Sequence, residues 1–580
     1  MKNILEKQKK IMLNSLAKQK KDIRIKPMSN KPGNHVVTVL LHDYFHRGVF
    51  KQVIGEKQWS RFESRLDKNV KDTLSLLNTF DIKATFFTLG WIADNYPEII
   101  KRLVSEGHEI ANAGYWARSA TEMKPEQLRE DLLRSKEALE RAGSNKIIGY
   151  RCAYQWFHTP DFWVLDILAE EGYVYDASFR PPLWQFIKKS SQRFSHIYET
   201  KYGKIWEFPT STSSLIGFNL PIAGGSYLRL FPHFLMLQGF KKWCKETESP
   251  FVLYFHPWEL DTQQPVINAA GKFSKICQYR NLGKMGWILP AYFREGKFQS
   301  ISQYLKIPLE YPDLKQRPAP GELDAIEIKA ESERDASAAY EIQNVSVVIP
   351  CYNESSSLLY LSKALDELKM ESHEKYTFKF ILVDDCSKDD TYTILNKLFG
   401  MREDCKVLKH EKNMGVAAAL KTGIIEATSE IVCTIDADCS YDPLELLKMI
   451  PLLEDNVDMV TASPYHPDGF VIGVPRWRLF LSKTLSIMYH LVLNHKLSTY
   501  TSCFRVCRRS SVLSLPCLYG DFRGIIEQLA LLDLQGGVIR EYPTTLQCRI
   551  FGHSKMKVSK TIFGHLKLLS VIIKYNRMQT

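Results

Sequence analysis

The stretch IVCTIDADCS, residues 431–440, decides the fold of the second half of this chain. Its first five residues are apolar or β-branched, and the residues that follow carry two carboxylates, Asp436 and Asp438. An apolar run of this length that ends in acids is typical of a buried strand in a parallel sheet. Side chains two positions apart in an extended segment point to the same side. The stretch therefore predicts a strand with a paired carboxylate site, suited to a divalent cation, at its carboxyl end.

The same pattern recurs on both sides of this stretch. Apolar runs that predict strands cover residues 345–349, 378–383, 405–408 and 458–461. Stretches with helical periodicity lie between them, at residues 355–369, 390–400, 416–427 and 443–453. Strands that alternate with helices through short connections predict a parallel sheet, and hence an α/β fold.

Polar side chains also follow the first two of these strands. Pro350, Tyr352 and Glu354 follow the first strand, and Asp384 with Asp385 follow the second. Either group alone could form a turn or cap a helix. Because ligands bind at the carboxyl ends of the strands in open α/β sheets, the three groups together predict one binding site.

These residues identify a family resemblance. The second half resembles family 2 glycosyltransferases of the GT-A fold, and within them the dolichyl- or polyprenyl-phosphate sugar transferases. The matching residues are 345–354, 383–391, 413–415 with Ala419 and Gly423, 436–438, 465–468, 501–505, 541–543 and 549–555. The resemblance implies a Rossmann-like nucleotide-sugar domain. It also implies inverting transfer of a sugar to a lipid-phosphate or glycan acceptor.

The same resemblance implies roles for individual residues. Asp436 and Asp438 would hold Mg²⁺ or Mn²⁺ and the donor diphosphate, and Asp438 would be catalytic. Glu527 is the second catalytic candidate, as a positioning or acceptor-side residue. The remaining donor-binding residues would be Pro350, Tyr352, Glu354, Asp384, Arg549 and Lys555. Alternatively, Arg549 and Lys555 are solvated surface charges.

The first half also alternates strands and helices. Apolar strand-like runs cover residues 35–41, 84–89 and 251–255, and helical stretches cover 70–80, 98–106 and 124–142. This half resembles the NodB-like polysaccharide deacetylases, which implies a distorted (β/α) barrel with a divalent metal held by one Asp and two His. The matching residues are 36–46, 84–90, 107–110, 149–151, 172–176 and 255–259.

The positions at which this half departs from that family are those of the catalytic base and the metal ligands. Asp43 is present as the metal aspartate, but the position of the expected base holds Leu40 or Leu41. Ala113 and Ala117 replace the two expected histidines. Because a metal needs several ligands placed together, this site is predicted to be degenerate.

Two other motif residues remain. Arg151 is present, and His256 stands at the position of the catalytic acid. A proton donor without an activated water achieves little, so this half is predicted to be an inactive deacetylase that binds glycan or serves as a scaffold. A site rebuilt from His42 and His46 is the alternative. The five tryptophans Trp91, Trp116, Trp156, Trp184 and Trp258 could stack on sugar rings, or pack in the core.

The charge is concentrated at the two ends of the 580-residue chain, whose net charge is +12. Residues 1–31 carry ten Lys/Arg and two acids, and residues 549–580 carry seven Lys/Arg and no acid. The organisation predicted is a basic tail (1–32), a deacetylase-like domain (33–307), an acidic linker rich in Pro and Ala (308–343) and a glycosyltransferase domain (344–580). The bodies between the basic ends are nearly neutral, which argues against a nucleic-acid-binding protein.

The partners follow from charge and hydropathy. No apolar run reaches the length of a membrane span, so the chain is expected in the cytoplasm, at most peripheral at the cytoplasmic membrane face. Residues 479–493 predict a core helix and residues 566–573 an interfacial one. An anionic membrane is the expected partner of the basic tail. The twelve cysteines include no CxxC pair, which indicates reduced thiols.

The leading hypothesis is a metal-dependent glycosyltransferase of surface-glycan synthesis with a fused, inactive deacetylase-like domain. One alternative is a bifunctional glycosyltransferase and deacetylase. The other is a non-catalytic glycan-binding scaffold, against which the intact Asp384, Asp436 and Asp438 argue.

Overall fold

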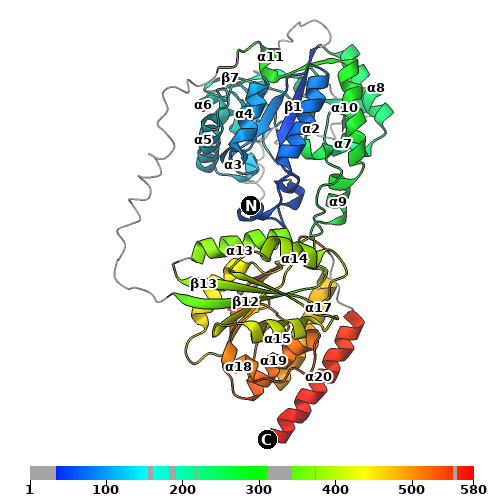
Figure 1. The fold of residues 1–580 in the computed structure, drawn as a ribbon. Coiled ribbons are helices and arrows are strands. Elements are labelled where there is room, and N and C mark those ends of the chain that lie inside the picture. The colour runs from blue at the N-terminus through cyan, green and yellow to red at the C-terminus, as the bar shows by residue number, and fades with distance from the viewer. Residues whose placement is uncertain are drawn as a thin grey trace, which may run out of the picture. The chain divides into compact units, whose positions relative to one another are not determined.

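The chain forms two compact units in the computed structural model (Figure 1). Unit 1 comprises residues 1–51, 64–265 and 272–326, and unit 2 comprises residues 52–63, 266–271 and 327–580. The structure describes residues 34–46, 48–153, 161–181, 191–215, 218–310, 342–372, 374–552 and 558–579. The predicted basic tail, most of the predicted linker, Trp156 and Trp184 lie outside these residues.

A mostly parallel sheet forms the centre of unit 1, in the order β10-β1-β2-β3-β4-β5-β7-β6, with β11 beside β1. Its strands are β1 (Asn34–Leu41), β2 (Thr85–Thr88), β3 (Glu109–Asn112), β4 (Gly149–Tyr150), β5 (Tyr175–Asp176), β6 (His196–Thr200), β7 (Gly203–Glu207), β10 (Val252–Phe255) and β11 (Lys297–Gln299). Among the described strands of this sheet, β6 and β7 are the pair that runs antiparallel. Within the described residues the end strands β10 and β6 do not pair, so no closed barrel is seen in that part.

Helices connect these strands, as the alternating pattern predicted. They are α2 (Leu66–Thr79), α3 (Gly90–Asn95), α4 (Pro97–Ser105), α5 (Pro125–Arg141), α6 (Trp163–Glu170), α7 (Ser226–Leu230), α8 (His233–Glu246), α9 (Lys272–Tyr279), α10 (Met285–Glu295) and α11 (Ile301–Leu305). A separate hairpin pairs β8 (Thr212–Leu215) with β9 (Phe218–Pro221). The strands and helices expected at residues 35–142 and 251–255 are confirmed.

Unit 2 contains a seven-stranded sheet in the order β14-β13-β12-β15-β18-β16-β19. The strands are β12 (Gln343–Cys351), β13 (Tyr376–Asp384), β14 (Cys405–Lys409), β15 (Ile431–Thr434), β16 (Met459–Ser463), β18 (Arg505–Arg508) and β19 (Ile539–Pro543). Strands β12 to β15 are parallel to one another, and β18 runs antiparallel to β15 and β16. All five predicted strands of this half are confirmed.

Helices cover both faces of this sheet. In Figure 1, α13 (Leu358–Ser372) and α14 (Thr391–Phe399) lie on one side. On the other side lie α15 (Val416–Glu426), α18 (Arg509–Leu513) and α19 (Phe522–Leu534). A parallel sheet must be covered in this way because its strands are apolar on both faces. Val345, Val347, Val348 and Ile349 of β12 are 0% exposed, and each contributes about 1.5–3 kcal/mol through burial.

One glycine allows α15 to pack closely on β12. A Cβ atom at Gly423 would lie 2.2 Å from Cγ1 of Val348, closer than any real contact. Any larger residue at this position would push the helix away from the strand.

Two helices depart from expectation. The helix predicted at 443–453 is divided into 3-10 and α segments, Pro443–Glu445, Leu446–Met449 and Ile450–Leu452. Pro443 and Pro451 account for this, since proline lacks the N–H that a continuous helix needs. The core helix predicted at 479–493 is α17 (Arg476–Val492), and only one side of it packs on the core. Ser486 and Tyr489 are buried and Leu485, Met488 and Val492 pack against the core, whereas Phe480 and Leu491 are exposed. In the described part of the chain, no helix is both long and apolar enough to cross a membrane.

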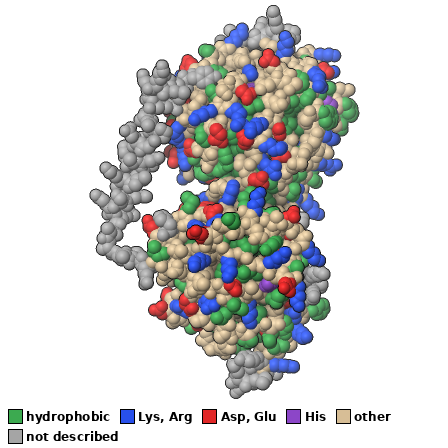
Figure 2. All heavy atoms as spheres, viewed as in Figure 1, with side chains coloured by type: hydrophobic (Ala, Val, Ile, Leu, Met, Phe, Trp, Pro, Cys, Tyr) green, Lys and Arg blue, Asp and Glu red, His purple; other side chains and the backbone are tan. Residues whose placement is uncertain are grey.

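Three further elements complete unit 2. Two short strands, β17 (Phe470–Ile472) and β20 (Thr545–Gln547), form a parallel pair outside the main sheet. The last helix, α20 (Val558–Gln579), packs against α17 and α19. On the face of the molecule drawn in Figure 2, basic and acidic side chains are interspersed over each unit. This distribution agrees with the nearly neutral bodies expected from the sequence.

Candidate functional site

Three neighbouring strands of unit 2 end at the same edge of the sheet. β12 pairs in parallel with β13, which sets Cys351 opposite Asp384. It also pairs in parallel with β15, which sets Val348 opposite Thr434. The residues that follow these strands therefore gather at one place, as expected for a ligand site in an open α/β sheet.

Each of the three strand ends contains a non-glycine residue with a left-handed backbone. The φ angles of Asn353, Cys386 and Cys439 are 53°, 57° and 52°. Asn353 is held by its neighbours: its N–H donates to Oγ of Ser387 at 2.9 Å, and its Oδ1 accepts from the N–H of Lys388 at 2.6 Å. Such conformations cost about 1–3 kcal/mol each and cluster at functional sites.

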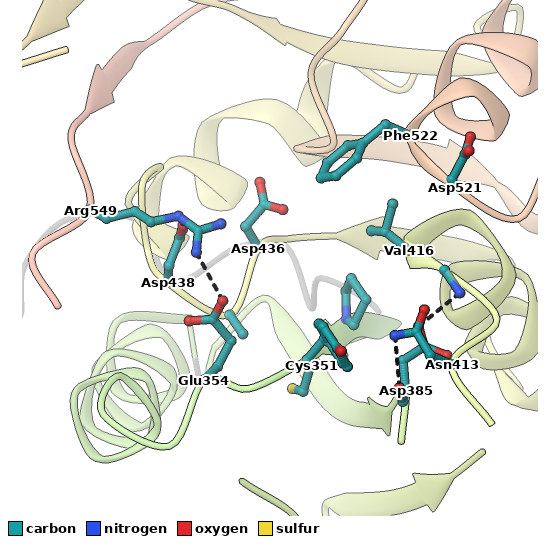
Figure 3. A pocket seen from close by; sticks show the side chains of 14 residues that line it. Cys351, Glu354, Asp385, Asn413, Val416, Asp436, Asp438, Asp521, Phe522 and Arg549 are labelled. Atoms are coloured by element: carbon teal, nitrogen blue, oxygen red, sulfur yellow. Dashed lines mark hydrogen bonds and ion pairs between the residues drawn. The ribbon is translucent and has the colours of Figure 1, made fainter. Parts of the chain in front are cut away.

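The strand ends enclose a cavity of about 260 Å³, drawn in Figure 3. Six residues predicted from the sequence line it: Pro350, Tyr352, Glu354, Asp436, Asp438 and Arg549. The other lining residues are Cys351, Asp385, Asn413, Gly415, Val416, Ala437, Asp521 and Phe522. The cavity is therefore formed by segments that lie up to about two hundred residues apart in the chain.

A single arginine bridges two of the carboxylates in this cavity. Nη1 of Arg549 donates to Oε1 of Glu354 at 2.9 Å, and its Nε forms an ion pair with Oδ2 of Asp438. The other oxygen of Asp438 accepts from the N–H of Ser440 at 2.9 Å. Figure 3 shows Asp436 next to this group, without a dashed line to Arg549.

The charge in this group is unbalanced. Burial and the adjacent charge of Asp438 raise the pKa of Asp436 to about 7, and Arg549 opposes that rise. Three carboxylates, Glu354, Asp436 and Asp438, face one guanidinium. Oxygen donors of this kind suit Mg²⁺ or Mn²⁺, which bind one or two carboxylates together with substrate phosphates. Among the described residues no group of three metal-ligating side chains forms, so Asp436 and Asp438 fit the predicted cation as two carboxylate ligands that leave its other positions to substrate phosphate and water.

Asp384 and Asp385 have different surroundings. Asp384 is fully buried, and its carboxylate accepts from the N–H of Ser387 at 3.3 Å. Asp385 lines the cavity instead, and its carboxylate accepts from the N–H groups of Met414 and Gly415 at 2.7 and 2.8 Å. The donor-binding role of Asp384 stays a prediction, and its neighbour organises the loop before α15.

Gly415 is required in that loop. Its φ is 96°, and a Cβ atom there would lie 2.5 Å from the carbonyl oxygen of Gly520. The loop can therefore approach the start of α19, where Asp521 and Phe522 reach the cavity.

Glu527, like Asp384, is not among the residues that line the cavity. The carboxylate of Glu527, on α19, accepts from the N–H groups of Leu518 and Tyr519 at 3.0 and 3.1 Å. Burial raises the pKa of Glu527. Lys555 lies outside the described residues. The catalytic role of Glu527 and the phosphate role of Lys555 stay predictions.

The sequence reasoning missed Asp521 and Phe522. Asp521 caps α19, since its carboxylate accepts from the N–H of Arg523 at 3.0 Å, and it also pairs with the Arg523 guanidinium. Phe522 is 41% exposed although it is aromatic. Neither belongs to a motif, so only the fold could reveal them. Asn413 and Gly415 could have been found, because they belong to a matched segment.

In unit 1, the carboxylate of Asp43 is engaged by the chain itself. It accepts from the N–H of Tyr44 at 2.9 Å, from the N–H of Arg65 at 2.8 Å and from Oγ of Ser64 at 3.0 Å. Burial raises the pKa of Asp43 to about 6 despite these bonds. The predicted metal aspartate thus anchors the start of α2.

No ligands stand where the two metal histidines were expected. Ala113 and Ala117 are both buried. The ring of His46 is buried too, and its Nδ1 accepts from the N–H of Asp43 at 3.0 Å. Among the described residues, no three His, Cys, Asp or Glu side chains form a group that could hold a metal.

The ring of His256 is held in place by a carboxylate, as expected for a histidine that donates or accepts a proton. Its Nδ1 lies 3.2 Å from Oε2 of Glu259, and Oε1 of Glu259 accepts from Nε of Arg229 at 3.0 Å. Burial alone would raise the pKa of Glu259, but the charge of Arg229 and the hydrogen bonds from His256 outweigh it and lower the pKa to about 2.

A second cavity, of about 390 Å³, opens beside His256 in unit 1. Leu40, His42, Arg180, Tyr227 and Phe273 are among its lining residues. The cavity is therefore roomy enough for a small ligand.

Arg151 is buried near this cavity but is not one of its lining residues. Its Nη1 donates to Oγ1 of Thr38 at 3.3 Å, and its guanidinium lies 4.6 Å from the ring centre of Tyr254. Burial lowers the pKa of Arg151 to about 10. Trp91 and Trp258 are buried as well, which favours the core role for these two tryptophans.

Family models match both halves of the chain. Residues 346–515 match "Glycosyl transferase family 2". Residues 56–163 match "Polysaccharide deacetylase", and residues 185–306 match "Domain of unknown function (DUF3473)".

Curated relatives match the second half. The dolichol-phosphate mannosyltransferase of Pyrococcus furiosus is 27% identical over 233 residues, which are 40% of this chain and 64% of that protein. The undecaprenyl-phosphate 4-deoxy-4-formamido-L-arabinose transferase of Pseudomonas savastanoi pv. phaseolicola is 30% identical over 175 residues, 30% of this chain and 50% of that protein. The chain thus spans less than two thirds of either relative.

Solved structures resemble each half. Glucosyl-3-phosphoglycerate synthase from Mycobacterium tuberculosis is 17% identical, with a TM-score of 0.33, and the match covers 40% of this chain and 80% of that one. A putative polysaccharide deacetylase from Mycobacterium smegmatis is 18% identical, with a TM-score of 0.33, and the match covers 51% and 100%. Likeness at this level says nothing about function.

The family models agree with both resemblances drawn from the sequence motifs, and the α/β sheets of the two units agree with the predicted fold class. The chain therefore joins a polysaccharide deacetylase domain in its first half to a family 2 glycosyltransferase domain in its second half.

Proposed function

We propose that unit 2 is an inverting glycosyltransferase that moves a sugar from a nucleotide-sugar donor to a lipid-phosphate or glycan acceptor in surface-polysaccharide synthesis. One observation carries this proposal: six donor-site residues predicted from the sequence line a single cavity at the carboxyl ends of parallel strands. Such a cavity is where open α/β sheets bind nucleotides.

The lining residues divide by chemistry. Pro350 and Tyr352 offer the apolar surface that a base and ribose need, and Glu354 can accept hydrogen bonds from ribose hydroxyls. Arg549, once released from Glu354 and Asp438, can donate two parallel hydrogen bonds to a phosphate. The cavity thus offers an apolar surface for a base and charged groups for the ribose and phosphates.

The cation belongs to the same proposal. Asp436 and Asp438 would hold Mg²⁺ or Mn²⁺, which would neutralise charge on the donor diphosphate as the sugar leaves. Without a cation or phosphate, Arg549 is the cationic group of the cavity that pairs with Asp438. Phosphate binding to Arg549 would free Asp438 for the cation.

The acceptor follows from chemistry and from the relatives. One relative is named for dolichol phosphate and the other for undecaprenyl phosphate, which supports a polyprenyl-phosphate acceptor. A phosphate monoester is already an anionic nucleophile, so no strong base is required. The carboxylate of Glu527 already accepts two backbone hydrogen bonds, which favours a positioning role over a catalytic one. We place the protein in the cytoplasm, as a peripheral protein of the membrane face where such lipids are held.

A donor panel tests this proposal. The full chain is incubated with UDP- and GDP-sugars, Mn²⁺ or Mg²⁺ and a polyprenyl phosphate, and both transfer and donor hydrolysis are measured. We expect turnover of one donor class and loss of turnover with a chelator. Absence of binding and turnover for every donor, with Asp436→Ala identical to wild type, would instead support the scaffold alternative.

For unit 1 we infer a glycan-binding or scaffold role without deacetylation. The inference is supported by the engaged carboxylate of Asp43, by Ala113 and Ala117 at the ligand positions, and by Leu40 in the cavity wall. The bifunctional alternative draws support from the oriented His256 alone.

Acetate release separates these two alternatives. The full chain is incubated with N-acetylated oligosaccharides and with Zn²⁺, Mn²⁺ or a chelator. We expect release at the background rate in every case, and the same rate for His256→Ala. A cooperative melting transition of unit 1 in the same preparation serves as the control for its folding. Chelator-sensitive release that is lost in His256→Ala would establish the bifunctional enzyme.

A further inference from the structure

Two short segments from the first half of the chain belong to unit 2. They are residues 52–63 and 266–271, whereas the rest of unit 2 begins at residue 327. The first contains the 3-10 helix Glu56–Arg61, and the second directly precedes α9. We call them the two inserted segments. Because they are distant in sequence from the strands of unit 2, tertiary contacts must hold them in this unit.

The second inserted segment binds the chain just after Arg549. The N–H of Asn268 donates to the carbonyl oxygen of Ile550 at 2.7 Å, and its Nδ2 donates to the carbonyl oxygen of Gly552 at 2.9 Å. Arg549 directly precedes Ile550 and lines the cavity. One residue therefore holds the chain at two points next to a cavity residue.

The chain just before Arg549 is contacted as well. Sγ of Cys548 donates to the carbonyl oxygen of Ala269, in the second inserted segment, at 3.7 Å. Nε2 of Gln58, in the first inserted segment, donates to Oε1 of Gln547 at 3.3 Å. Both inserted segments therefore contact the residues that lead into Arg549.

A buried arginine anchors the first inserted segment to the core of unit 2. Arg61 is 2% exposed, its Nε donates to Oε2 of Glu367 at 2.7 Å, and its Nη2 lies 3.1 Å from Oδ1 of Asp442. Glu367 belongs to α13, and Asp442 caps the 3-10 helix that begins at Pro443. A buried guanidinium with two carboxylate partners is firmly held, because separation would leave its charge unpaired.

The residue after this anchor packs on the chain that carries Arg549. Phe62 is 1% exposed, and its ring centre lies 5.2 Å from that of Tyr360 on α13 and 5.8 Å from that of Phe551. Its carbonyl oxygen accepts from Nζ of Lys363, also on α13, at 2.6 Å. Phe551 comes two residues after Arg549. The anchored segment thus presents a buried ring to this part of the chain.

The chain around Arg549 depends on such contacts because it has no regular structure of its own. β20 ends at Gln547, and residues 548–552 belong to no helix or strand. Figure 3 shows the side chain of Arg549 pointing from this stretch into the cavity, toward Glu354. A shift of the stretch would therefore move the guanidinium as well.

The task proposed for Arg549 tolerates little movement. Its guanidinium leaves Glu354 and Asp438, with which it now pairs, and donates two parallel hydrogen bonds to a phosphate. A displacement of about 1 Å at a reacting site can cost about a hundredfold in rate. A backbone held on both sides of Arg549 keeps the guanidinium in place while its partners change.

We propose that the two inserted segments are positioning elements of the glycosyltransferase site, which hold residues 547–552 so that Arg549 can bind the donor diphosphate. The binding of the diphosphate rests on the proposed function, whereas the placement of the chain does not. On this proposal the first half of the chain contributes to sugar transfer through these segments, and this contribution needs neither deacetylation nor glycan binding.

Binding measurements on the full chain test the proposal. The ligands are UDP and GDP with Mn²⁺, and uridine and guanosine, which lack the phosphates. Asn268→Ala removes the bond to Gly552, and Phe62→Leu removes the ring that packs on Phe551. We expect each variant to bind the preferred diphosphate about tenfold more weakly than wild type does, and to bind the matching nucleoside equally well. A merely structural defect would weaken both ligands alike, and that result would overturn the proposal.

A double-mutant cycle relates the loss to Arg549. In Arg549→Ala the guanidinium is absent, so the addition of Asn268→Ala should weaken diphosphate binding no further. Additive losses would show that Asn268 acts on a group other than Arg549, which would contradict the proposed positioning.

The matched controls are Val266→Ala and Ser60→Ala, at side chains that are exposed in the same two segments. Both should bind UDP and GDP as wild type does, because neither side chain is among those that contact residues 547–552. Weaker diphosphate binding in these controls, equal to that of Asn268→Ala, would count against a specific role of Asn268.

Hydrogen exchange of residues 545–552 provides a readout that requires no nucleotide. Protection should fall in Asn268→Ala and in Phe62→Leu, and should be unchanged in the two controls. Wild-type protection together with wild-type diphosphate binding in both variants would overturn the proposal. If wild type binds neither UDP nor GDP, the proposed function fails, and hydrogen exchange still decides whether the inserted segments hold this part of the chain.

Discussion

Replacing Asp438 with Asn is expected to lower the rate of sugar transfer by about a thousandfold, which corresponds to about 4 kcal/mol of lost transition-state stabilisation. The substitution keeps the size of the side chain and removes its charge. An Asn oxygen can still accept from the N–H of Ser440, which now lies 2.9 Å from Asp438. The loss should therefore come from the cation and the diphosphate rather than from the fold.

Stability should change little in this variant, because two effects oppose each other. Removal of one charge relieves the repulsion that raises the pKa of Asp436, but it also takes an ion-pair partner from Arg549. A direct readout is the binding of a nucleoside diphosphate with and without Mn²⁺. Wild type should bind more tightly with Mn²⁺, and Asp438→Asn should bind equally in both conditions.

The matched control is Asp455→Asn, at a fully exposed carboxylate in the same unit. It should transfer sugar at the wild-type rate. If Asp438→Asn also did so, Asp438 could not be a ligand of the cation or the diphosphate, and the assignment of the cavity would fail.

The strands were predictable because their chemistry is local. A run such as residues 345–349 is apolar on both faces and ends in polar residues, and only a buried parallel strand satisfies both features. The position of a break in a helix is harder to predict. Pro451 disrupts the stretch 443–453 although its apolar spacing suits a helix, and the structure there changes to 3-10 segments.

The core prediction for α17 holds on one side of the helix only, for a different reason. Its apolar residues surround most of the helix, and periodicity cannot tell which of them the rest of the fold covers. The structure covers the side with Ser486 and Tyr489 and leaves Phe480 and Leu491 exposed. Burial of a helix face is a tertiary property, because it depends on what packs there.

In the candidate site, too, local patterns could be predicted from the sequence and tertiary contacts could not. Asp436 and Asp438 could be predicted because two acids after an apolar strand share one side of it. The resemblance implied Asp384 as the donor-binding residue, but Asp385 lines the cavity. Neighbours in an extended segment point to opposite sides, and the sequence does not show which side faces the ligand. Phe522 reaches the cavity from α19 through the close approach of Gly415 to Gly520. No local pattern encodes that approach.

Unit 1 should be strongly destabilised by Glu259→Gln. The carboxylate of Glu259 and the guanidinium of Arg229 are both 0% exposed and lie 3.0 Å apart. The substitution leaves the guanidinium charge buried without its partner, which typically costs about 3–5 kcal/mol. For a unit of roughly 300 residues that corresponds to a fall of about 5–8 °C in melting temperature.

Substitution of the other partner, Arg229→Met, should lower the free energy of unfolding of unit 1 by at least as much. Besides the ion pair, Arg229 donates to the carbonyl oxygens of Cys277, Gln278 and Arg280, at 2.7 to 3.1 Å. The variant leaves these acceptors without that donor, so the double variant should recover only part of the loss. The stability that the double variant does not regain measures the contribution of the carbonyl contacts to the free energy of unfolding, separately from that of the ion pair.

Calorimetry of the full chain can assign the transition. A nucleoside diphosphate with Mn²⁺ should raise only the melting temperature of unit 2, which identifies the remaining transition as that of unit 1.

The ion pair between Glu259 and Arg229 also predicts that the stability of unit 1 depends on pH in the acid range. Since the pKa of Glu259 is lowered to about 2, its contribution is complete above the ordinary value of about 4.5 and is lost as the pH falls between the two. Glu259→Gln should remove that part of the pH dependence, and a variant that melts as wild type does at every pH would show that the pair contributes nothing to folding.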